Sequence, residues 1–260
     1  MKTLRGSTEE RHRKILDLVR SGVSQVPEIA RVLDVSPSTI RRDLSVLQST
    51  GILARTYGGA SLLSPFTEKS VDENVHIHFS QKVDIAKIAA ALVPENSTVF
   101  IDAGSTCNFL SEQLIHHREL TVVTRGLEIA TTLASARNVK LVMVGGLMRP
   151  LSHGLVGPLA ELAIQRLHFD VAFFGADAVD PRLGLGEPTI EELSIKEKVA
   201  ERSDHTYVLA DSAKLSNSKP PSWSFLETPW TLITDSGASP SVIKEFRTRN
   251  VEVMLSSSSG

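Results

Sequence analysis

Six short apolar runs in residues 76–260 each give way to small polar turn residues and then to a helical pattern. Short apolar runs of this kind favour buried strands, and their regular alternation with helices favours a parallel sheet covered by helices. The runs are Thr98–Asp102, Leu120–Val123, Lys140–Val144, Val171–Phe174, Tyr207–Ala210 and Leu232–Ile233. We therefore expect residues 76–255 to form an α/β domain with a mostly parallel sheet.

The first 62 residues show three helical patterns in close succession instead. The third pattern begins at Ser36 and Pro37, where serine is a good N-cap and proline fits the first helical position. Ile40, Leu44 and Leu47 follow at i, i+4 and i+7 and form one buried stripe. The tight turn before this helix is typical of a helix-turn-helix, whose second helix enters the major groove of DNA. The side chains that this stripe turns outward are Ser38, Thr39, Arg41, Arg42 and Ser45.

Two short strands around Gly58 and Gly59 are expected to form a β-hairpin wing after the third helix. Small polar side chains suit the edges of bases, and arginines suit phosphates or the acceptor atoms of guanine. Asp43 would be repelled by phosphate, so we expect it to hold Arg42 or a neighbouring basic side chain. A solvated helical hairpin with a charged face is the alternative to DNA binding. The candidate DNA-binding residues are Ser36, Ser38, Thr39, Arg41, Arg42, Ser45, Arg55 and Tyr57.

The charge distribution also separates the two parts of the sequence. Residues 1–62 carry ten Lys and Arg against six Asp and Glu, a net charge of +4, while the remainder carries 18 against 24, a net charge of −6. A basic head on an acidic body favours contact of the head alone with a polyanion. We expect residues 1–62 to form a winged helix-turn-helix domain, residues 63–75 a polar linker with one proline, and residues 256–260 a disordered, serine-rich tail.

Several other classes of protein are disfavoured by the sequence. Cys107 is the single cysteine, so no internal disulfide can form and a reducing compartment is expected. The beginning of the sequence lacks an apolar run that would act as a signal peptide, and no stretch reaches the length of a membrane span. His76 and His78 alternate, but no cluster of Cys or carboxylates accompanies them, so we expect neither a metal nor a cofactor. These features indicate a cytoplasmic protein without a membrane partner.

The strongest candidate for a ligand site lies where the first strand of the body meets a helix. Ligands of parallel α/β sheets bind beyond the carboxyl ends of the strands, and Gly104-Ser105-Thr106 follows such a strand. A helix N-terminus offers unpaired amides and the positive end of a dipole, which suits a phosphate group. Arg125 and Arg149 are expected to add fixed positive charge. An ordinary βα turn remains the alternative, because Gly, Ser and Thr are also common turn residues.

The sequence resembles the DeoR family of bacterial sugar-metabolism regulators. In the head the resemblance runs from Arg13–Leu16 through Val35–Leu44 to the Tyr57–Ala60 segment, where the family has its recognition helix and the end of its DNA-binding domain. In the body the segments that resemble the family, in the same order, are residues 102–106, 147–149, 154–158, 175–177 and 211–214.

The family's C-terminal domain is similar to sugar-phosphate isomerases and binds a phosphorylated sugar or a related metabolite. The resemblance implies that Asp102, Gly104, Ser105, Thr106 and Arg149 hold the phosphate. It further implies that Asp177, Lys196 and Lys214 line the sugar end. Thr124, Arg125, Gly145, Gly146 and Asp211 complete the candidate effector-binding set, since each follows a strand of the expected sheet.

The sequence also departs from the family at several places in the body. Arg125 stands where the family commonly has asparagine, and Cys107 stands where it commonly has threonine. Leu215-Ser216-Asn217 replaces the usual Phe-Gly-Arg. We therefore expect a site that is family-like at the phosphate and unusual at the sugar.

Three functions compete at this point. The first is a DNA-binding regulator, a repressor by family habit, whose operator binding is controlled by a phosphorylated sugar. The second is a sugar-phosphate isomerase with an added head, in which Asp177 would act as the base and Lys196 or Lys214 as the electrophile. The third is a DNA-binding assembly factor that has lost its ligand. We favour the first, which is not an enzyme and which would act as a dimer or higher homo-oligomer so that two heads meet successive major grooves.

Overall fold

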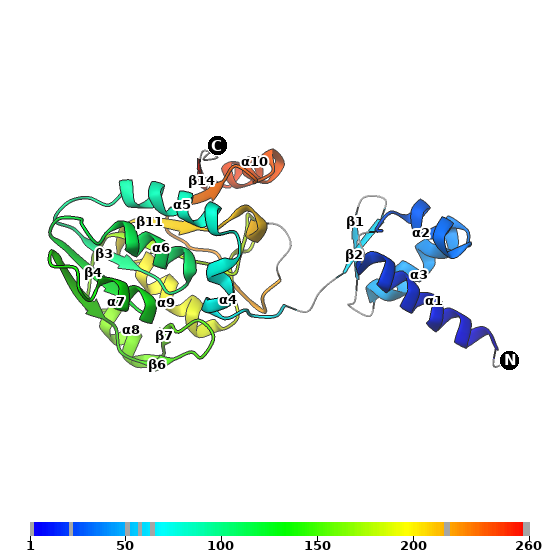
Figure 1. Cartoon of the computed structure of the whole chain (residues 1–260), viewed down its shortest axis with the longest axis horizontal. Coiled ribbons are helices and arrows are strands. Elements are labelled where there is room, and N and C mark those ends of the chain that lie inside the picture. The colour runs from blue at the N-terminus through cyan, green and yellow to red at the C-terminus, as the bar shows by residue number, and fades with distance from the viewer. Residues whose placement is uncertain are drawn as a thin grey trace. The chain divides into compact units, whose positions relative to one another are not determined.

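The chain divides into two compact units, residues 1–67 and residues 68–260 (Figure 1). The computed structural model describes residues 3–20, 23–49, 53–56, 59–62, 66–215 and 219–256. The linker expected at residues 63–75 extends too far, because Glu68 and the residues after it belong to the second unit. Among the described residues, no helix is long and apolar enough to cross a membrane.

The first unit is a winged helix-turn-helix. Its elements are α1 (Thr3–Arg20), α2 (Val26–Leu33), α3 (Pro37–Ser49), β1 (Leu53–Thr56) and β2 (Gly59–Leu62). Ile40, Leu44 and Leu47 of α3 are buried against α1 and α2, which confirms the stripe expected from their spacing. Ser36 caps α3, since its Oγ accepts a hydrogen bond of 3.2 Å from the amide of Thr39.

The turn and the wing follow the pattern that the sequence indicates. Asp34 ends α2 with φ at +52°, a left-handed conformation that aspartate tolerates, and this residue reverses the chain toward α3. β1 and β2 pair antiparallel, with Thr56 opposite Gly59. The side chain of Arg55, and Tyr57 altogether, lie outside the described residues.

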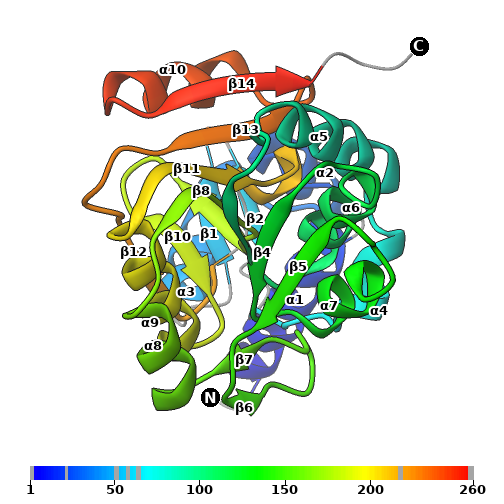
Figure 2. The same cartoon turned by 90° about the vertical axis from the view of Figure 1, so that its left-hand side faces the viewer.

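A seven-stranded, wholly parallel sheet forms the centre of the second unit (Figure 2). The six apolar runs all supply strands of this sheet, which confirms the predicted fold class. A seventh strand, β14, includes Ser256, so the expected disordered tail begins too early, and residues 257–260 lie outside the described residues. The strand order is β14 (Glu252–Ser256), β13 (Thr231–Asp235), β11 (Ser203–Leu209), β8 (Phe169–Phe174), β3 (Thr98–Ile101), β4 (Leu120–Thr124) and β5 (Val139–Met143).

Helices cover both faces of this sheet, and each face has its own apolar core. One core is formed with α5 (Phe79–Ala91), α6 (Ser105–Gln113) and α7 (Leu127–Leu133). The other is formed with α8 (Pro158–Ile164), α9 (Ile190–Ala200) and α10 (Pro240–Thr248). The strands in between bury both of their faces, which explains their nearly continuous apolar runs.

Smaller elements surround the carboxyl edge of the sheet. They are α4 (Val71–His76), the β6 (Leu147–Met148) and β7 (Leu155–Val156) pair, the 3-10 turn η1 (Ser212–Leu215), and an antiparallel sheet of β9 (Ala178–Asp180), β10 (Gly184–Glu187) and β12 (Ser222–Ser224).

The order of the strands locates a crevice. From β3 the chain proceeds to β4 and β5 on one side, whereas β8, β11, β13 and β14 follow one another on the other side. The loops after β3 and β8 therefore diverge at the carboxyl edge. A switch point of this kind is where open α/β sheets bind ligands.

Candidate functional site

A cleft with about 530 Å³ of space between protein atoms, open solvent included, lies at this switch point. Residues that follow β3, β4 and β8 meet there with residues from α9, η1 and the segment that begins the second unit. Seven of the predicted effector-binding residues line the cleft: Gly104, Ser105, Thr106, Arg125, Asp177, Lys196 and Lys214. The other residues lining it are Glu68, Lys69, Val71, Asn74, Ala103, Ser152, Gly175, Ala176, Glu187 and Glu192.

The N-terminus of α6 forms one wall of the cleft. Gly104 is its N-cap and has φ at +111°, a conformation that favours glycine. The amide of Asn108 makes a helical hydrogen bond of 2.9 Å to the carbonyl of Gly104. The amides of Ser105, Thr106 and Cys107 precede this bond and have no partner within the helix. The wall is therefore suited to an anion.

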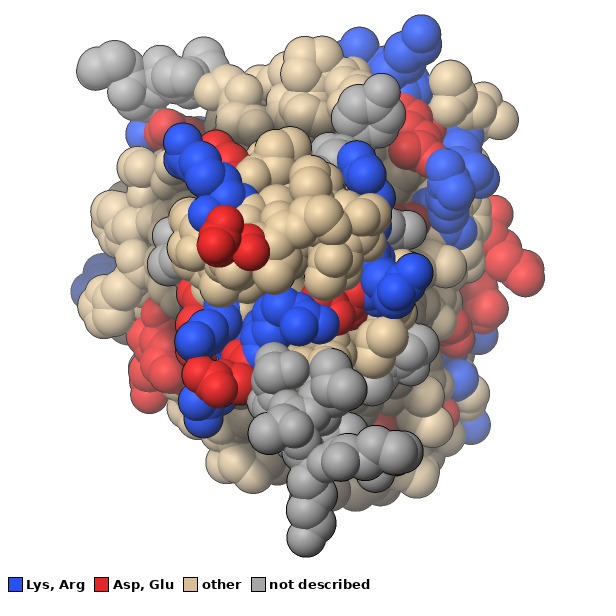
Figure 3. Space-filling model, turned by 90° about the vertical axis from the view of Figure 1, so that its right-hand side faces the viewer, with Lys and Arg blue, Asp and Glu red and all other residues tan. Residues whose placement is uncertain are grey.

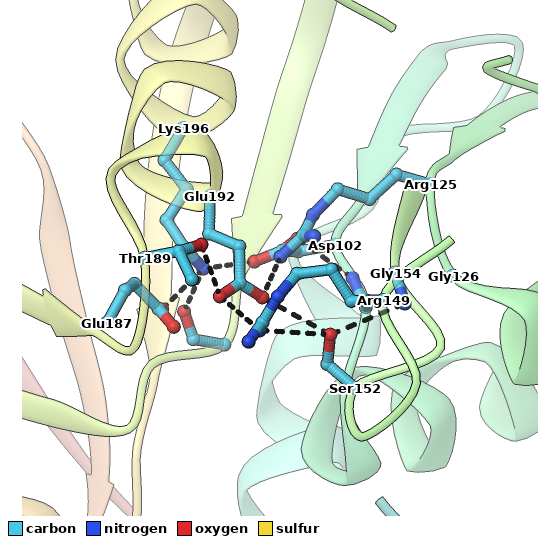
Figure 4. Close-up of polar contacts among 12 residues, drawn as sticks. Asp102, Arg125, Gly126, Arg149, Ser152, Gly154, Glu187, Thr189, Glu192 and Lys196 are labelled. Carbon is cyan, nitrogen blue, oxygen red and sulfur yellow. Dashed lines mark hydrogen bonds and ion pairs between the residues drawn. The ribbon is translucent and has the colours of Figure 1, made fainter. Parts of the chain in front are cut away.

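Asp102 forms the centre of a buried ionic network below the cleft (Figure 4). Arg125 Nε donates to one of its carboxylate oxygens and Lys196 Nζ donates to the other, from opposite sides. Burial alone would raise the pKa of Asp102, but the two cations outweigh it and lower that pKa. The carboxylate is thus held ionised in a site that excludes water.

A second carboxylate, Glu192 of α9, connects two arginines. Arg149 Nη1 donates to Glu192, and Arg125 Nη2 lies 3.5 Å from its other oxygen. Arg149 also donates two hydrogen bonds to Glu68, from Nη1 to Oε1 at 2.9 Å and from Nη2 to Oε2 at 2.7 Å. The charge of Arg149 is therefore already balanced by two carboxylates. Because a Cβ at Gly154 would come within 2.4 Å of Arg125 Nη1, the buried guanidinium requires glycine there.

Lys196 and Glu187 complete the network. Besides Asp102, Lys196 Nζ donates to the carbonyl of Gly175 at 2.7 Å and lies 2.9 Å from Glu187 Oε1. Burial raises the pKa of Glu187 to about 8, with Glu192 acting in the same direction and Lys196 opposing it. Burial therefore favours the neutral acid form of Glu187 at the wall of the cleft.

The remaining predicted effector-binding residues are not part of the cleft lining. Asp102 is buried beneath the cleft. Thr124 donates to the carbonyl of Ile101 and accepts from the amide of Gly126, so it orders the turn after β4. Asp211 is buried and accepts a hydrogen bond from the amide of Ala213. Those outside the lining are Asp102, Thr124, Gly145, Gly146, Arg149 and Asp211.

Several residues of the cleft and its network were not identified from the sequence. Glu68, Ser152 and Glu187 lie on segments whose approach depends on tertiary packing. Glu192 had a usable signal, since it precedes Lys196 by four residues and the two share one face of α9. Lys82 on α5 is buried beside Ser105, far from the turn motifs in sequence.

In the first unit, the outward face of α3 has the predicted composition. Arg41 and Arg42 are exposed, and Ser45 Oγ donates to the carbonyl of Arg41. The hydroxyl of Ser36 lies 2.7 Å from that of Ser38 and 2.8 Å from that of Thr39. In the view of Figure 3, basic side chains are interspersed with acidic ones and form no continuous basic surface.

Asp43 is buried on the inner side of α3. It accepts hydrogen bonds from Arg11 Nε at 2.6 Å and Arg11 Nη2 at 3.0 Å, and it lies 3.1 Å from His12 Nε2. The partner is thus a basic residue of α1, while the neighbour Arg42 is not one of its contacts. Burial would raise the pKa of Asp43, but the hydrogen bonds from Arg11 and His12 outweigh it and lower that pKa.

We expect Asp43→Asn to lower the stability of the first unit by about 1–3 kcal/mol, since it removes charge-assisted bonds between α1 and α3. Because the folded pKa of Asp43 is depressed, its contribution is present above the unfolded pKa of about 3.9 and is lost as the pH falls through the folded pKa. Hydrogen exchange of α1 and α3 amides in the full chain measures both effects. The exposed Asp34→Asn variant is the control, and equal protection in the two variants would contradict this role of Asp43.

A winged helix-turn-helix joined to an α/β unit with a ligand cleft defines the class of DNA-binding transcriptional regulators. The family model described as DeoR C terminal sensor domain matches residues 77–236, and the DeoR-like helix-turn-helix domain matches residues 11–66. The chain therefore belongs to the DeoR family.

Two curated relatives extend over nearly the whole chain. The HTH-type transcriptional regulator GolR of Listeria innocua serovar 6a is 34% identical over 249 residues, which cover 95% of this chain and 98% of that protein. The putative aga operon transcriptional repressor of Escherichia coli O157:H7 is 30% identical over 257 residues, which cover 98% of this chain and 96% of that protein. Relatives named as transcriptional regulators favour the regulator over the isomerase.

Among solved structures, a D-ribose-5-phosphate isomerase in complex with phospho-erythronic acid matches with a TM-score of 0.39 and 19% identity. The match covers 52% of this chain and 53% of that chain.

Proposed function

We propose that this protein represses carbohydrate-metabolism genes and that a phosphorylated sugar in the cleft controls its binding to the operator. The observation that carries the proposal is the α6 N-terminus at the cleft, in a chain that also has a DNA-binding unit. The name of the aga operon relative supports repression. Operator binding requires the compartment that holds the chromosome, so we also propose that the protein is cytoplasmic.

In this proposal the phosphate binds at Gly104, Ser105 and Thr106, where amides precede the first helical hydrogen bond. The sugar lies toward Asp177 and Lys214 on the opposite side of the switch point. Arg125 and Lys196 then form the charged floor through Asp102. Arg149 does not contact the phosphate in this proposal, because its guanidinium is held by Glu68 and Glu192.

Arg149 holds the connector segment, residues 68–76, which follows the first unit directly in the sequence. Four of its residues line the cleft: Glu68, Lys69, Val71 and Asn74. The segment is held by the Glu68–Arg149 pair and by the amide of Val71, which donates to the carbonyl of Leu151 at 2.8 Å. We propose that effector binding moves this segment. Control of DNA binding then requires that the effector bind the two arrangements with different affinity.

A second copy of the chain is part of the proposal. One recognition helix covers a half-site, and regulators of this class place two such helices about 34 Å apart on successive major grooves. We therefore propose that the protein binds its operator as a dimer or a higher homo-oligomer.

We propose that the sugar phosphate is bound without turnover. An isomerase would need a cation with a donor directed at the developing oxyanion. Lys196 Nζ already donates to Asp102 and to the carbonyl of Gly175, and it lies 2.9 Å from Glu187 Oε1. Lys214 Nζ donates to the carbonyl of Ala176 at 2.6 Å. Screening sugar phosphates in calorimetry, with the product analysed afterwards, tests binding without conversion.

We expect Thr106→Glu to abolish the response to effector and to leave operator binding near wild type. The new carboxylate would lie where the phosphate binds, and two like charges in a small desolvated site repel strongly. A DNA-release assay with the effector from the screen measures this. The wild type should leave the operator as effector rises, while the variant stays bound.

The control for this prediction is Thr131→Glu, which places the same charge on the exposed face of α7. It should respond to effector like the wild type. An unaltered response of Thr106→Glu would place the phosphate elsewhere and refute the proposed site.

A further inference from the structure

Lys82 is a buried lysine on α5, beside the α6 N-terminus. It is 1% exposed. Its ammonium donates to Ser105 Oγ at 3.0 Å and to the backbone carbonyl of Asn74. Among the described ion pairs, none joins Lys82 to a carboxylate within 4.0 Å. Burial of a charge without a counter-charge is unfavourable, so its retention here needs a reason.

The other buried cations of this region differ in this respect. Arg125 and Lys196 share Asp102, and Arg149 is held between Glu68 and Glu192. Their charges are balanced before any ligand arrives. Lys82 is left as the buried cation that an incoming anion would neutralise.

The contact with Lys82 also determines the direction in which the Ser105 hydroxyl can donate its hydrogen. A serine hydroxyl has one hydrogen to donate and two lone pairs that accept. Because Lys82 donates to Ser105 Oγ, that oxygen acts as an acceptor toward α5, and its own hydrogen remains available to the cleft. Ser105 lines the cleft next to the amides of α6 that precede the first helical bond.

We propose that Lys82 is the positioning residue of the phosphate site: it supplies the counter-charge for the phosphate and orients the Ser105 hydroxyl as a donor toward it. This inference rests on the proposed function, since it assumes that the cleft binds a phosphorylated ligand. Lys82 also holds the carbonyl of Asn74 in the connector segment, so the charge that attracts the phosphate is joined to the segment that leads to the first unit.

The electrostatics of the site give a pH signature. Burial lowers the pKa of Lys82 to about 8, with Lys214 and Lys69 acting in the same direction and Asp211 and Asp177 opposing them. A bound phosphate favours the charged amine, so binding takes up a proton once the pH exceeds 8. The second pKa of a phosphate monoester is about 6, so a monoester ligand stays dianionic in this range.

The test measures by calorimetry how the full chain binds two probes, inorganic phosphate and glucose 6-phosphate. Unphosphorylated glucose is the reference. Lys82→Met should weaken binding of both phosphates by roughly tenfold or more, since one pKa unit of lost interaction is tenfold. Its melting temperature should equal or exceed that of the wild type, because a buried charge has been removed. Lys87→Met on the exposed face of the same helix is the matched control.

Measuring the affinity at several pH values separates the effect of the Lys82 charge from an effect of Lys82 packing. Wild-type affinity for glucose 6-phosphate should fall by about half between pH 7 and 8 and then by up to about tenfold per unit. Lys82→Arg, which stays charged, should remove most of this fall. Glu187, whose pKa is about 8, also gains charge in this range, so Glu187→Gln is included and should retain the fall.

Two results would overturn the proposal in distinguishable ways. A folded Lys82→Met variant that binds both probes like the wild type, or a wild-type affinity that stays flat to pH 9.5, refutes the assignment of Lys82 alone. Failure of the wild type to bind either phosphate refutes the phosphate site itself, and with it the proposed function.

Discussion

Replacing Asp102 by asparagine should lower the free energy of unfolding of the second unit by about 3–5 kcal/mol. Asp102 is fully buried and receives hydrogen bonds from Arg125 and Lys196. Asparagine keeps the shape but not the charge, so two buried cations lose their shared counter-charge. The loss of one partner of a buried ion pair is among the most destabilising of single substitutions.

Urea unfolding of the full chain, followed by the fluorescence of Trp223 and Trp230 in the second unit, measures this loss. Asp204→Asn is the matched control, because Asp204 pairs with His168 at 3.2 Å on the surface, where both side chains are more than half exposed. It should cost at most about 1 kcal/mol.

A double substitution tests the same network from the other side. Lys196→Met in the Asp102→Asn background removes one of the two stranded cations and leaves Arg125 beside Glu192. We expect this double variant to recover part of the lost stability. Strict additivity of the two single substitutions would contradict the network as described.

The acid sensitivity of the second unit should have the same origin. The pKa of Asp102 is lowered in the folded state, so its contribution is present above the unfolded pKa and lost as the pH falls through the folded pKa. The Asp102→Asn variant should lack this part of the pH dependence.

Replacing both Arg41 and Arg42 by alanine should weaken operator binding by about 2–6 kcal/mol per head, if each contributes the usual 1–3 kcal/mol of a base contact. Both side chains are exposed on α3, while the opposite face of that helix is buried. The substitutions therefore leave the core of the first unit unaltered, and the effect should appear in DNA binding and not in stability.

Gel-shift titration against the DNA upstream of the protein's own gene, at several salt concentrations, measures this effect. Loss of phosphate contacts should also reduce the dependence of affinity on salt. Lys14→Ala is the control, because Lys14 lies on α1 and pairs with Glu10 at 3.0 Å. If the double variant binds the operator like the wild type, α3 is not the recognition helix.

The local patterns in the sequence were sufficient to predict the architecture of the two units. The spacing of Ile40, Leu44 and Leu47 placed α3 with the correct inward face, and each apolar run supplied a strand. These patterns work because a helix or strand must bury one face, and the period of the apolar residues records which face that is. The α6 N-terminus was predictable for the same reason, since strand, glycine and helix follow one another within a few residues.

The partners of the charged residues were not predictable in this way. The sequence suggested Arg125 and Arg149 as cations for a phosphate, but the fold brings Asp102, Glu192 and Glu68 against them and balances their charge. The signals for these contacts are absent from the sequence, because Glu68 and Arg149 are 81 residues apart. Lys82 was missed because a lysine within a helix pattern normally indicates a solvated face.

The sequence by itself thus determined the class of protein: a recognition helix, a parallel sheet and an anion-suited turn, each specified by neighbours a few residues away. Only the tertiary structure decided which buried charges are paired within the protein, and that Lys82 has no carboxylate partner among the described ion pairs. The physical reason is that the free energy of a charge inside a protein depends on its desolvation and on the groups within a few ångströms. Those groups come from remote segments that only the folded chain brings together.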